Sequence, residues 1–250
     1  MELNISKKLE VELGNFYHCD NIYNEDIDVY DADTGNIILL LRKNIIPDKY
    51  YEINQSIITH SKSISTNRGN AAGKATIQGL VKGKEHWKAY PSKLCDKNGN
   101  PHTKETSSSF FIYNDGRISK RSRSNSVASS AIGGFDKSPQ YPCRLTAWTR
   151  DHLKQYQSIF PLCQYISDRY FEYFPDKWLN QYEIYEKSPK DFLIPGTNFS
   201  TITLNNTFRT ASHKDKGDCK KGMTCFTVKK VGEYSGGQLH FPDYDIGVNV

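Results

Sequence analysis

Apolar and polar residues alternate in short blocks near the start of the chain. Val29 and Tyr30 lead into a turn at residues 31–36 that is rich in Asp, Gly and Asn, and the apolar run Ile37–Leu41 follows it. Apolar segments on both sides of such a turn are typical of a β-hairpin. We therefore predict a hairpin within the first fifty residues, with Ile37–Leu41 as a buried strand.

The middle of the chain has a helical pattern. Between residues 149 and 174 one apolar stripe recurs every three or four positions, formed by Leu153, Tyr156, Phe160, Cys163, Ile166, Tyr170 and Phe174. This period predicts an amphipathic helix that Thr149 caps. Because proline lacks a backbone donor, Pro161 predicts a kink or two abutting helices. A second helix is predicted over residues 176–187, with Trp178, Tyr182 and Tyr185 facing the core.

Strand patterns dominate the remainder. They cover residues 199–204, 223–231, 238–241 and 245–250, and a further short strand is expected at 109–113. Helices followed by antiparallel strands indicate an α+β fold, in which the helices pack on one side of a β-sandwich or barrel.

Length and composition limit the class of protein. With 250 residues, of which 37% are hydrophobic and 24% charged, the chain can bury a core and is expected to form one domain, at most two. A disordered tail, a collagen-like repeat and a coiled coil are excluded. The longest apolar run, Ile37–Leu41, is far shorter than the ~20 residues of a membrane span. No secretory signal is visible, and six scattered cysteines favour reduced thiols. We therefore expect an intracellular protein of the cytoplasm or nucleus, neither secreted nor membrane-bound.

The charge pattern is mildly basic. Lys and Arg total 33 against 28 Asp and Glu, a net charge of +5 that favours an anionic partner. Residues 117–124 form a basic, Ser-rich run, so Arg121 and Arg123 are candidate phosphate contacts, and Lys214 and Lys216 are two more. A solvated loop is the competing interpretation of the run.

One short motif suggests metal chemistry. His213 and Asp215 are two positions apart, and in an extended segment such residues point to the same side. An imidazole and a carboxylate on one side are two of the three ligands of the 2-His-1-carboxylate triad that binds Fe(II). The spacing alone, however, fits a structural or surface pair better than a metal site.

The surrounding sequence changes that interpretation. Residues 199–218, with Phe208-Arg209-Thr210 before the His-Lys-Asp motif, closely resemble the signature of the TET/JBP family of nucleic-acid base dioxygenases. Further segments also resemble family motifs in collinear order, namely residues 31–43, 67–73, 131–136, 143–149, 234–242 and 244–250. The resemblance covers most of the chain.

The resemblance implies a specific fold and chemistry. It implies a double-stranded β-helix, a jelly-roll barrel with buttressing helices, with residues 1–50 as an N-terminal β-hairpin region and 51–250 as the oxygenase domain. Fe(II) would be held by His213 and Asp215, with 2-oxoglutarate as co-substrate. Active-site lining is expected from Arg209 and Asn206, and nucleic-acid contacts from Lys214, Lys216, Arg121, Arg123 and Arg68. The substrate would be the methyl group of thymine or 5-methylcytosine in DNA, with RNA as the alternative.

The sequence departs from the family pattern at its end. A complete member continues beyond the strand equivalent to residues 245–250 into a distal iron-binding His and an Arg for 2-oxoglutarate. We therefore expect an incomplete oxygenase domain that neither folds robustly nor turns over alone, and whose missing strands come from further sequence in cis or from a second polypeptide. His240 is interpreted as a strand residue, with a substitute ligand as the alternative. Alternative functions are a catalytically inactive fragment, a nucleic-acid-binding protein of the same fold, and an oxygenase acting on a protein or nucleotide.

Overall fold

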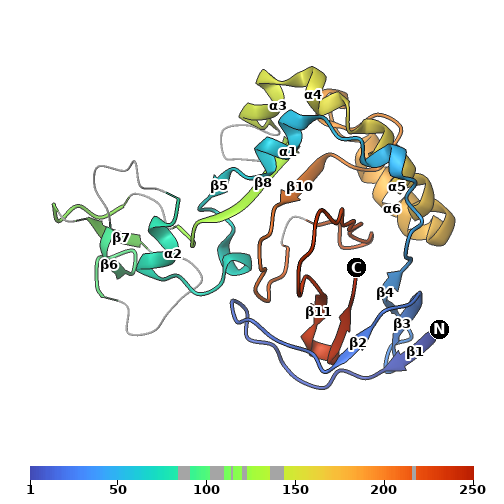
Figure 1. The fold of residues 1–250 in the computed structure, drawn as a ribbon, viewed down its shortest axis with the longest axis horizontal. Coiled ribbons are helices and arrows are strands. Elements are labelled where there is room, and N and C mark those ends of the chain that lie inside the picture. Colours follow the sequence, from blue (N-terminus) through green and yellow to red (C-terminus); the bar gives the residue numbers. More distant parts are fainter. Residues whose placement is uncertain (84–90, 102–109, 114, 120–122, 136–143, 216–217) are drawn as a thin grey trace.

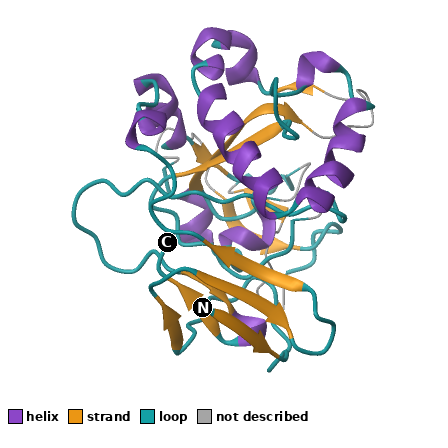
Figure 2. Ribbon diagram, turned by 90° about the vertical axis from the view of Figure 1, so that its right-hand side faces the viewer, coloured by secondary structure: helices purple, strands orange, loops and turns teal. Residues whose placement is uncertain are grey.

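The computed structural model describes residues 1–83, 91–101, 110–113, 115–119, 123–135, 144–215 and 218–250. Short strands are arranged in four small sheets, and the main helices gather on one side of the molecule (Figure 2). The structure combines several small sheets with a few helices, so the predicted α+β class is confirmed.

The N-terminal sheet contains the predicted hairpin. Its order is β1-β3-β4, built from β1 (Glu2–Ile5), β3 (Ile27–Asp31) and β4 (Ile37–Leu41). Strands β3 and β4 pair antiparallel, which confirms the hairpin, although β4 is mostly half-buried. The Asp31 carboxylate closes the turn by accepting hydrogen bonds from the backbone N–H groups of Asp33 and Thr34. Such local bonding explains why an Asp-rich segment reverses the chain here.

The last strands join this first region. A sheet of order β11-β12-β2 is built from β11 (Leu239–Phe241), β12 (Ile246–Val248) and β2 (Asn21–Tyr23), and β12 runs parallel to β2. Together with the N-terminal sheet it encloses one core, whose buried members are Ile27, Val29, Leu41, Ile246 and Val248. The N-terminal sheet, β2, β11 and β12 consequently lie side by side (Figure 1).

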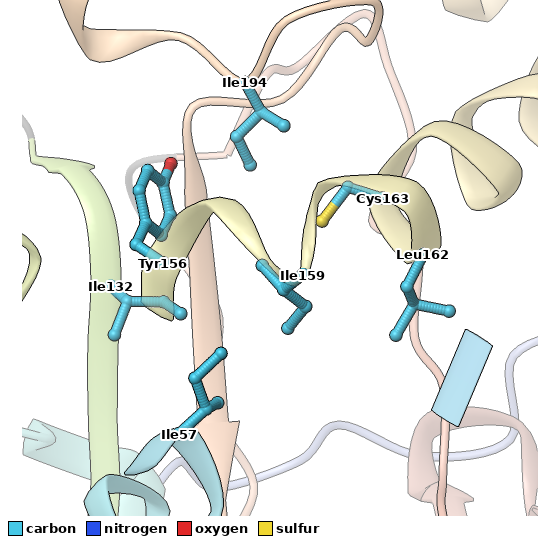
Figure 3. Packing of buried hydrophobic residues seen from close by; sticks show 7 residues of the cluster. All are labelled: Ile57, Ile132, Tyr156, Ile159, Leu162, Cys163 and Ile194. Carbon is cyan, nitrogen blue, oxygen red and sulfur yellow. The ribbon is translucent and has the colours of Figure 1, made fainter. Parts of the chain in front are cut away.

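The central sheet carries the helical layer. Its order is β10-β8-β5, built from β10 (Thr201–Asn205), β8 (Val127–Phe135) and β5 (Ile64–Ser65), with β9 (Arg144–Leu145) paired to the far end of β8. The helices nearby are α1 (Gln55–Ser61), α3 (Ala147–Asp151), α4 (Leu153–Gln157), α5 (Phe160–Tyr173) and α6 (Pro175–Glu186). Their shared core contains Ile57, Ile132, Tyr156, Ile159, Leu162, Cys163 and Ile194 (Figure 3). This core joins the sheet to α1, α4 and α5.

A separate hairpin lies at one end of the molecule. It consists of β6 (Pro91–Cys95) and β7 (Phe110–Tyr113), and α2 (Ile77–Val81) packs against it. Figure 1 shows this group away from α3–α6. The remaining short elements are the 3-10 helices η1 (Asp48–Tyr51), η2 (Gly69–Ala72), η3 (Lys190–Phe192) and η4 (Pro242–Tyr244).

The predicted long helix is three helices. Thr146, not Thr149, caps α3 by accepting from the Thr149 backbone N–H. Thr149 is fully buried inside that helix, and its hydroxyl accepts from the N–H of Gly133 on β8. Pro161 lies in the first turn of α5, where a missing donor costs little, so it begins a helix and does not kink one.

Helix α6 and the segment after β10 also differ from expectation. The helix forms as predicted, but none of its residues is fully buried, and Trp178, Tyr182 and Tyr185 stack on one another. The strand expected at residues 223–231 is absent from the described chain. Its backbone and side chains bond elsewhere: the Met223 N–H donates to the Tyr170 hydroxyl, and Lys229 donates to the Tyr51 carbonyl. Alternating residues without a partner strand do not make a sheet.

Two further observations concern the cysteines and the possibility of a membrane span. The five described cysteines are free thiols. No helix within the described ranges is long and apolar enough to cross a membrane.

Candidate functional site

The segment that carries the His-Lys-Asp motif is held from two sides. After β10 the chain continues without regular structure, and the N–H of the buried Ala211 donates to the Ala71 carbonyl of η2 at 2.9 Å. The Ser212 N–H donates to the Asn15 carbonyl at 2.9 Å, and the Gly14 N–H donates to the Ser212 carbonyl at 2.8 Å. Three long-range backbone bonds thus fix the two residues just before His213.

His213 and Asp215 lie on the same side of this segment, as their spacing predicts. Nε2 of His213 is 3.7 Å from Oδ2 of Asp215, and the two side chains are 30% and 64% exposed. Nδ1 of His213 is 2.8 Å from the Ala211 carbonyl oxygen. Because a carbonyl can only accept, Nδ1 carries the hydrogen, and in the neutral ring the Nε2 lone pair faces the carboxylate. Two electron-rich atoms at this separation favour a cation between them.

The positions of these two side chains are compatible with binding one metal ion. Metal-ligating histidines commonly donate their other N–H to a carbonyl, which is the arrangement of His213. Two metal–ligand bonds of about 2.1 Å span at most about 4.2 Å, so one ion can contact both atoms across 3.7 Å. Among the residues that the structure describes, no three His, Cys, Asp or Glu side chains form a metal-binding group.

Arg68 lies within electrostatic range of Asp215. It precedes η2, is half-buried, and its Nε atom is fully buried without a hydrogen-bond partner among the described residues. Burial lowers the pKa of the Arg68 guanidinium, and the negative charge of Asp215 opposes that shift. A buried guanidinium nitrogen without an acceptor is costly, and a carboxylate is its natural partner. The nucleic-acid contact of Arg68 stays a prediction, and its buried Nε fits a carboxylate ligand as well.

Arg209 and Asn206 occupy different surroundings. The exposed Arg209 guanidinium lies 4.7 Å from the centre of the Phe16 ring. Asn206 donates from its side chain to the Ser61 hydroxyl of α1 at 3.3 Å, so its amide binds a helix end. Sequence reasoning missed Phe16, and nearly two hundred residues separate it from Arg209 without any local signal that links them.

His240 belongs to another cluster. On β11 its Nδ1 accepts from the Cys19 N–H at 3.3 Å, and its ring lies 5.5 Å from that of His18. Burial lowers the pKa of His240, and the neighbouring His18 and Arg209 lower it further. This agrees with its interpretation as a strand residue.

The basic candidates divide into three kinds. Lys214 is exposed next to His213, whereas Arg121 and Lys216 lie outside the described residues. Arg123 donates to the Thr66 hydroxyl at 3.0 Å and is half-buried. The following Ser124 is fully buried. The end of the Ser-rich run is therefore a packed part of the fold and not a solvated loop.

The described chain has one further hollow worth noting. A shallow cavity of about 570 Å³ lies along residues 230–238 and includes Asn249, and neither His213 nor Asp215 lines it. We therefore assign it no part in the site.

Comparison with known proteins finds a family to which part of the chain is similar. Residues 131–250 match the model of the Tet_JBP family, described as the oxygenase domain of the 2OGFeDO superfamily. Thymine dioxygenase JBP1 of Trypanosoma brucei brucei is 42% identical over 109 residues, which cover 43% of this chain and 12% of that protein. Thymine dioxygenase JBP1 of Crithidia fasciculata is 38% identical over 127 residues, or 49% of this chain and 15% of that protein.

A third relative shows the same limits of coverage. Thymine dioxygenase JBP1 of Leishmania infantum is 36% identical over 126 residues, or 49% of this chain and 15% of that protein. The matched part of the chain thus spans about one seventh of the length of these curated relatives. No solved structure matches significantly. Residues 131–250 are thus similar in sequence to the Tet_JBP oxygenase domain of the 2OGFeDO superfamily and to thymine dioxygenases.

Proposed function

We propose that this chain belongs to an Fe(II)- and 2-oxoglutarate-dependent dioxygenase that hydroxylates the methyl group of thymine or 5-methylcytosine in DNA. The observation that carries the proposal is the His213 ring, whose Nδ1 is bound to a carbonyl and whose Nε2 faces Asp215. The family match and the curated relatives, which are named thymine dioxygenases, support the reaction class. Within this proposal the small sheets belong to a double-stranded β-helix, and residues 51–250 carry the oxygenase fold in one unit with the N-terminal hairpin region.

Each residue then has a defined task. His213 and Asp215 hold the metal ion, and the Ala211 carbonyl fixes the imidazole orientation. Arg68 binds a carboxylate of 2-oxoglutarate through its otherwise unpartnered guanidinium nitrogen. Iron and 2-oxoglutarate, when bound, supply the oxidising chemistry, while the protein orients the groups and excludes water. The exposed Arg209 and Phe16 side chains, which contact each other, are the candidates for contact with a base that has left the duplex.

His213→Ala and Asp215→Ala are each expected to abolish Fe(II) binding, because each variant removes one directly coordinating group. An anaerobic iron titration of the 250-residue chain, and of the variants, measures this. His152→Ala, which removes an exposed histidine on the nearby helical layer, is the matched control and should bind iron normally. Equal iron affinity in all four proteins would contradict the metal assignment, as would the absence of iron binding by the unsubstituted chain.

Lys214→Glu is expected to weaken DNA binding and to lower the slope of log K against log salt by about one phosphate contact. The exposed ammonium next to His213 lies where an approaching DNA backbone would pass. Affinity measured over a series of salt concentrations tests this. Lys154→Glu, an equal charge reversal on the exposed face of α4, should leave the slope unchanged. The same slope in both variants would mean that Lys214 contacts no phosphate.

A further inference from the structure

Two polar residues at the end of the Ser-rich run hold a loop together. Oδ1 of Asn125 accepts from the Thr76 N–H at 2.8 Å, and its Nδ2 donates to the carbonyls of Ala72 at 3.0 Å and Lys74 at 2.8 Å. The hydroxyl of the fully buried Ser124 accepts from the Arg68 N–H at 3.0 Å. The loop at residues 66–76 is thus shaped by side chains some fifty positions away in the sequence.

This loop reaches the candidate metal site by two routes. In the first, the loop carries Arg68 and presents the Ala71 carbonyl to the Ala211 N–H. In the second, the Lys74 ammonium pairs with the Glu12 carboxylate at 3.1 Å, and that carboxylate accepts from the side chain of Asn15 at 3.0 Å. The backbone carbonyl of Asn15 in turn accepts a hydrogen bond from the Ser212 N–H, so both routes end next to His213.

The space around Asn125 fits its amide closely. A Cβ atom on Gly79 would lie 2.4 Å from Oδ1 of Asn125, far inside van der Waals contact. Asn125 makes one accepted and two donated hydrogen bonds, which requires an oxygen and an NH₂ group on one short side chain. An aspartate would keep the accepting oxygen and lose both donations.

We propose that Asn125, supported by Ser124, is a positioning residue for the metal site: it fixes the loop at residues 66–76, and the loop fixes Arg68 and the backbone before His213. What that site binds rests on the proposed function. Asn125 touches neither the His213 ring nor Asp215, so it acts only through the loop. Fixing supporting groups is how outer residues govern a site, and their loss typically weakens metal affinity or activity 10–100-fold.

Amide hydrogen exchange in the 250-residue chain tests the link directly. Asn125→Ala is expected to raise the exchange rate of the Ala211 amide about tenfold, because the loop that accepts its hydrogen bond opens locally. Asn125→Asp should fall between Asn125→Ala and the native chain. The control is Ser167→Ala, which removes a buried acceptor of the Trp178 indole N–H in the α5–α6 pair, and it should leave Ala211 unaffected.

Ligand binding supplies the functional readout. With Fe(II) under anaerobic conditions, Asn125→Ala is expected to bind 2-oxoglutarate about tenfold more weakly than the native chain does. Ser167→Ala is expected to bind it as tightly as the native chain. Adding Asn125→Ala to Arg68→Ala should cause no further loss, because both act on the same carboxylate contact.

The exchange experiment and the binding experiment distinguish the positioning role of Asn125 from the proposed function. Unchanged Ala211 exchange in Asn125→Ala would overturn the positioning role, whatever the chain binds. Faster exchange at Ala211 in a chain that binds neither Fe(II) nor 2-oxoglutarate would sustain the positioning role and contradict the proposed function. Additive losses in the Asn125 and Arg68 double variant would overturn the route through Arg68.

Discussion

Gly133→Ala is expected to lower the free energy of unfolding by about 2–6 kcal/mol, from backbone strain and overpacking of about 1–3 kcal/mol each. Gly133 lies on β8 with a φ of +94°, a conformation that residues with a side chain rarely adopt. A Cβ there would also lie 2.4 Å from the Ser200 carbonyl oxygen of the segment leading into β10. Because that atom belongs to the backbone of the paired strand, relief requires the β8–β10 ladder to separate.

Urea denaturation followed by far-UV circular dichroism measures this loss. Gly35→Ala is the matched control: Gly35 also has a positive φ, +69°, but no atom lies within 4 Å of its added Cβ. That variant should show the strain without the collision, a loss of about 1–3 kcal/mol at most. Equal losses in the two variants would mean that the close approach of β8 and β10 at Gly133 is not formed.

Ile27→Ala is expected to cost about 2–5 kcal/mol, the usual range for emptying a fully buried aliphatic site. Ile27 on β3 has no exposed surface and packs in the core that also contains Ile246 and Val248 of β12. The substitution should therefore loosen the first and the last strands of the chain together.

A single unfolding transition, with β12 amides losing protection alongside those of β3, is the expected result in hydrogen exchange. The control is Leu9→Ala, whose side chain is 42% exposed and which should change stability by no more than about 0.5 kcal/mol. Independent unfolding of residues 1–50 would instead favour the division into an N-terminal hairpin region and a separate oxygenase domain. The shared core argues for one unit.

The local sequence pattern predicted the elements that depend only on neighbouring residues. The β3–β4 hairpin follows from an Asp-rich turn that bonds to itself, and α6 follows from a periodic segment beginning after Phe174. Pro161 predicted a kink or two abutting helices, and the second alternative is confirmed, because the proline lies in the first turn of α5 after α4 has ended. Thr149 resembled a cap, and only packing against β8 shows it to be a buried acceptor.

Contacts between residues far apart in the sequence determined the features that the local pattern did not predict. Residues 223–231 alternate like a strand, yet their hydrogen bonds go to the Tyr170 hydroxyl of α5 and the Tyr51 carbonyl of η1, and a strand exists only where a neighbour pairs with it. Arg123 and Ser124 resembled a solvated basic run, but Thr66 and Arg68 take up their polar groups. Charge and composition do not report such partners.

The candidate site divides in the same way. By itself the sequence predicted that His213 and Asp215 point to one side, and the two side chains do lie 3.7 Å apart, although the segment is not a strand. Only the tertiary structure brought Arg68 within electrostatic range of Asp215, and only it joined Asn125 to the loop at residues 66–76. Contacts between residues fifty to two hundred positions apart depend on how whole elements pack, and no local period or propensity encodes them.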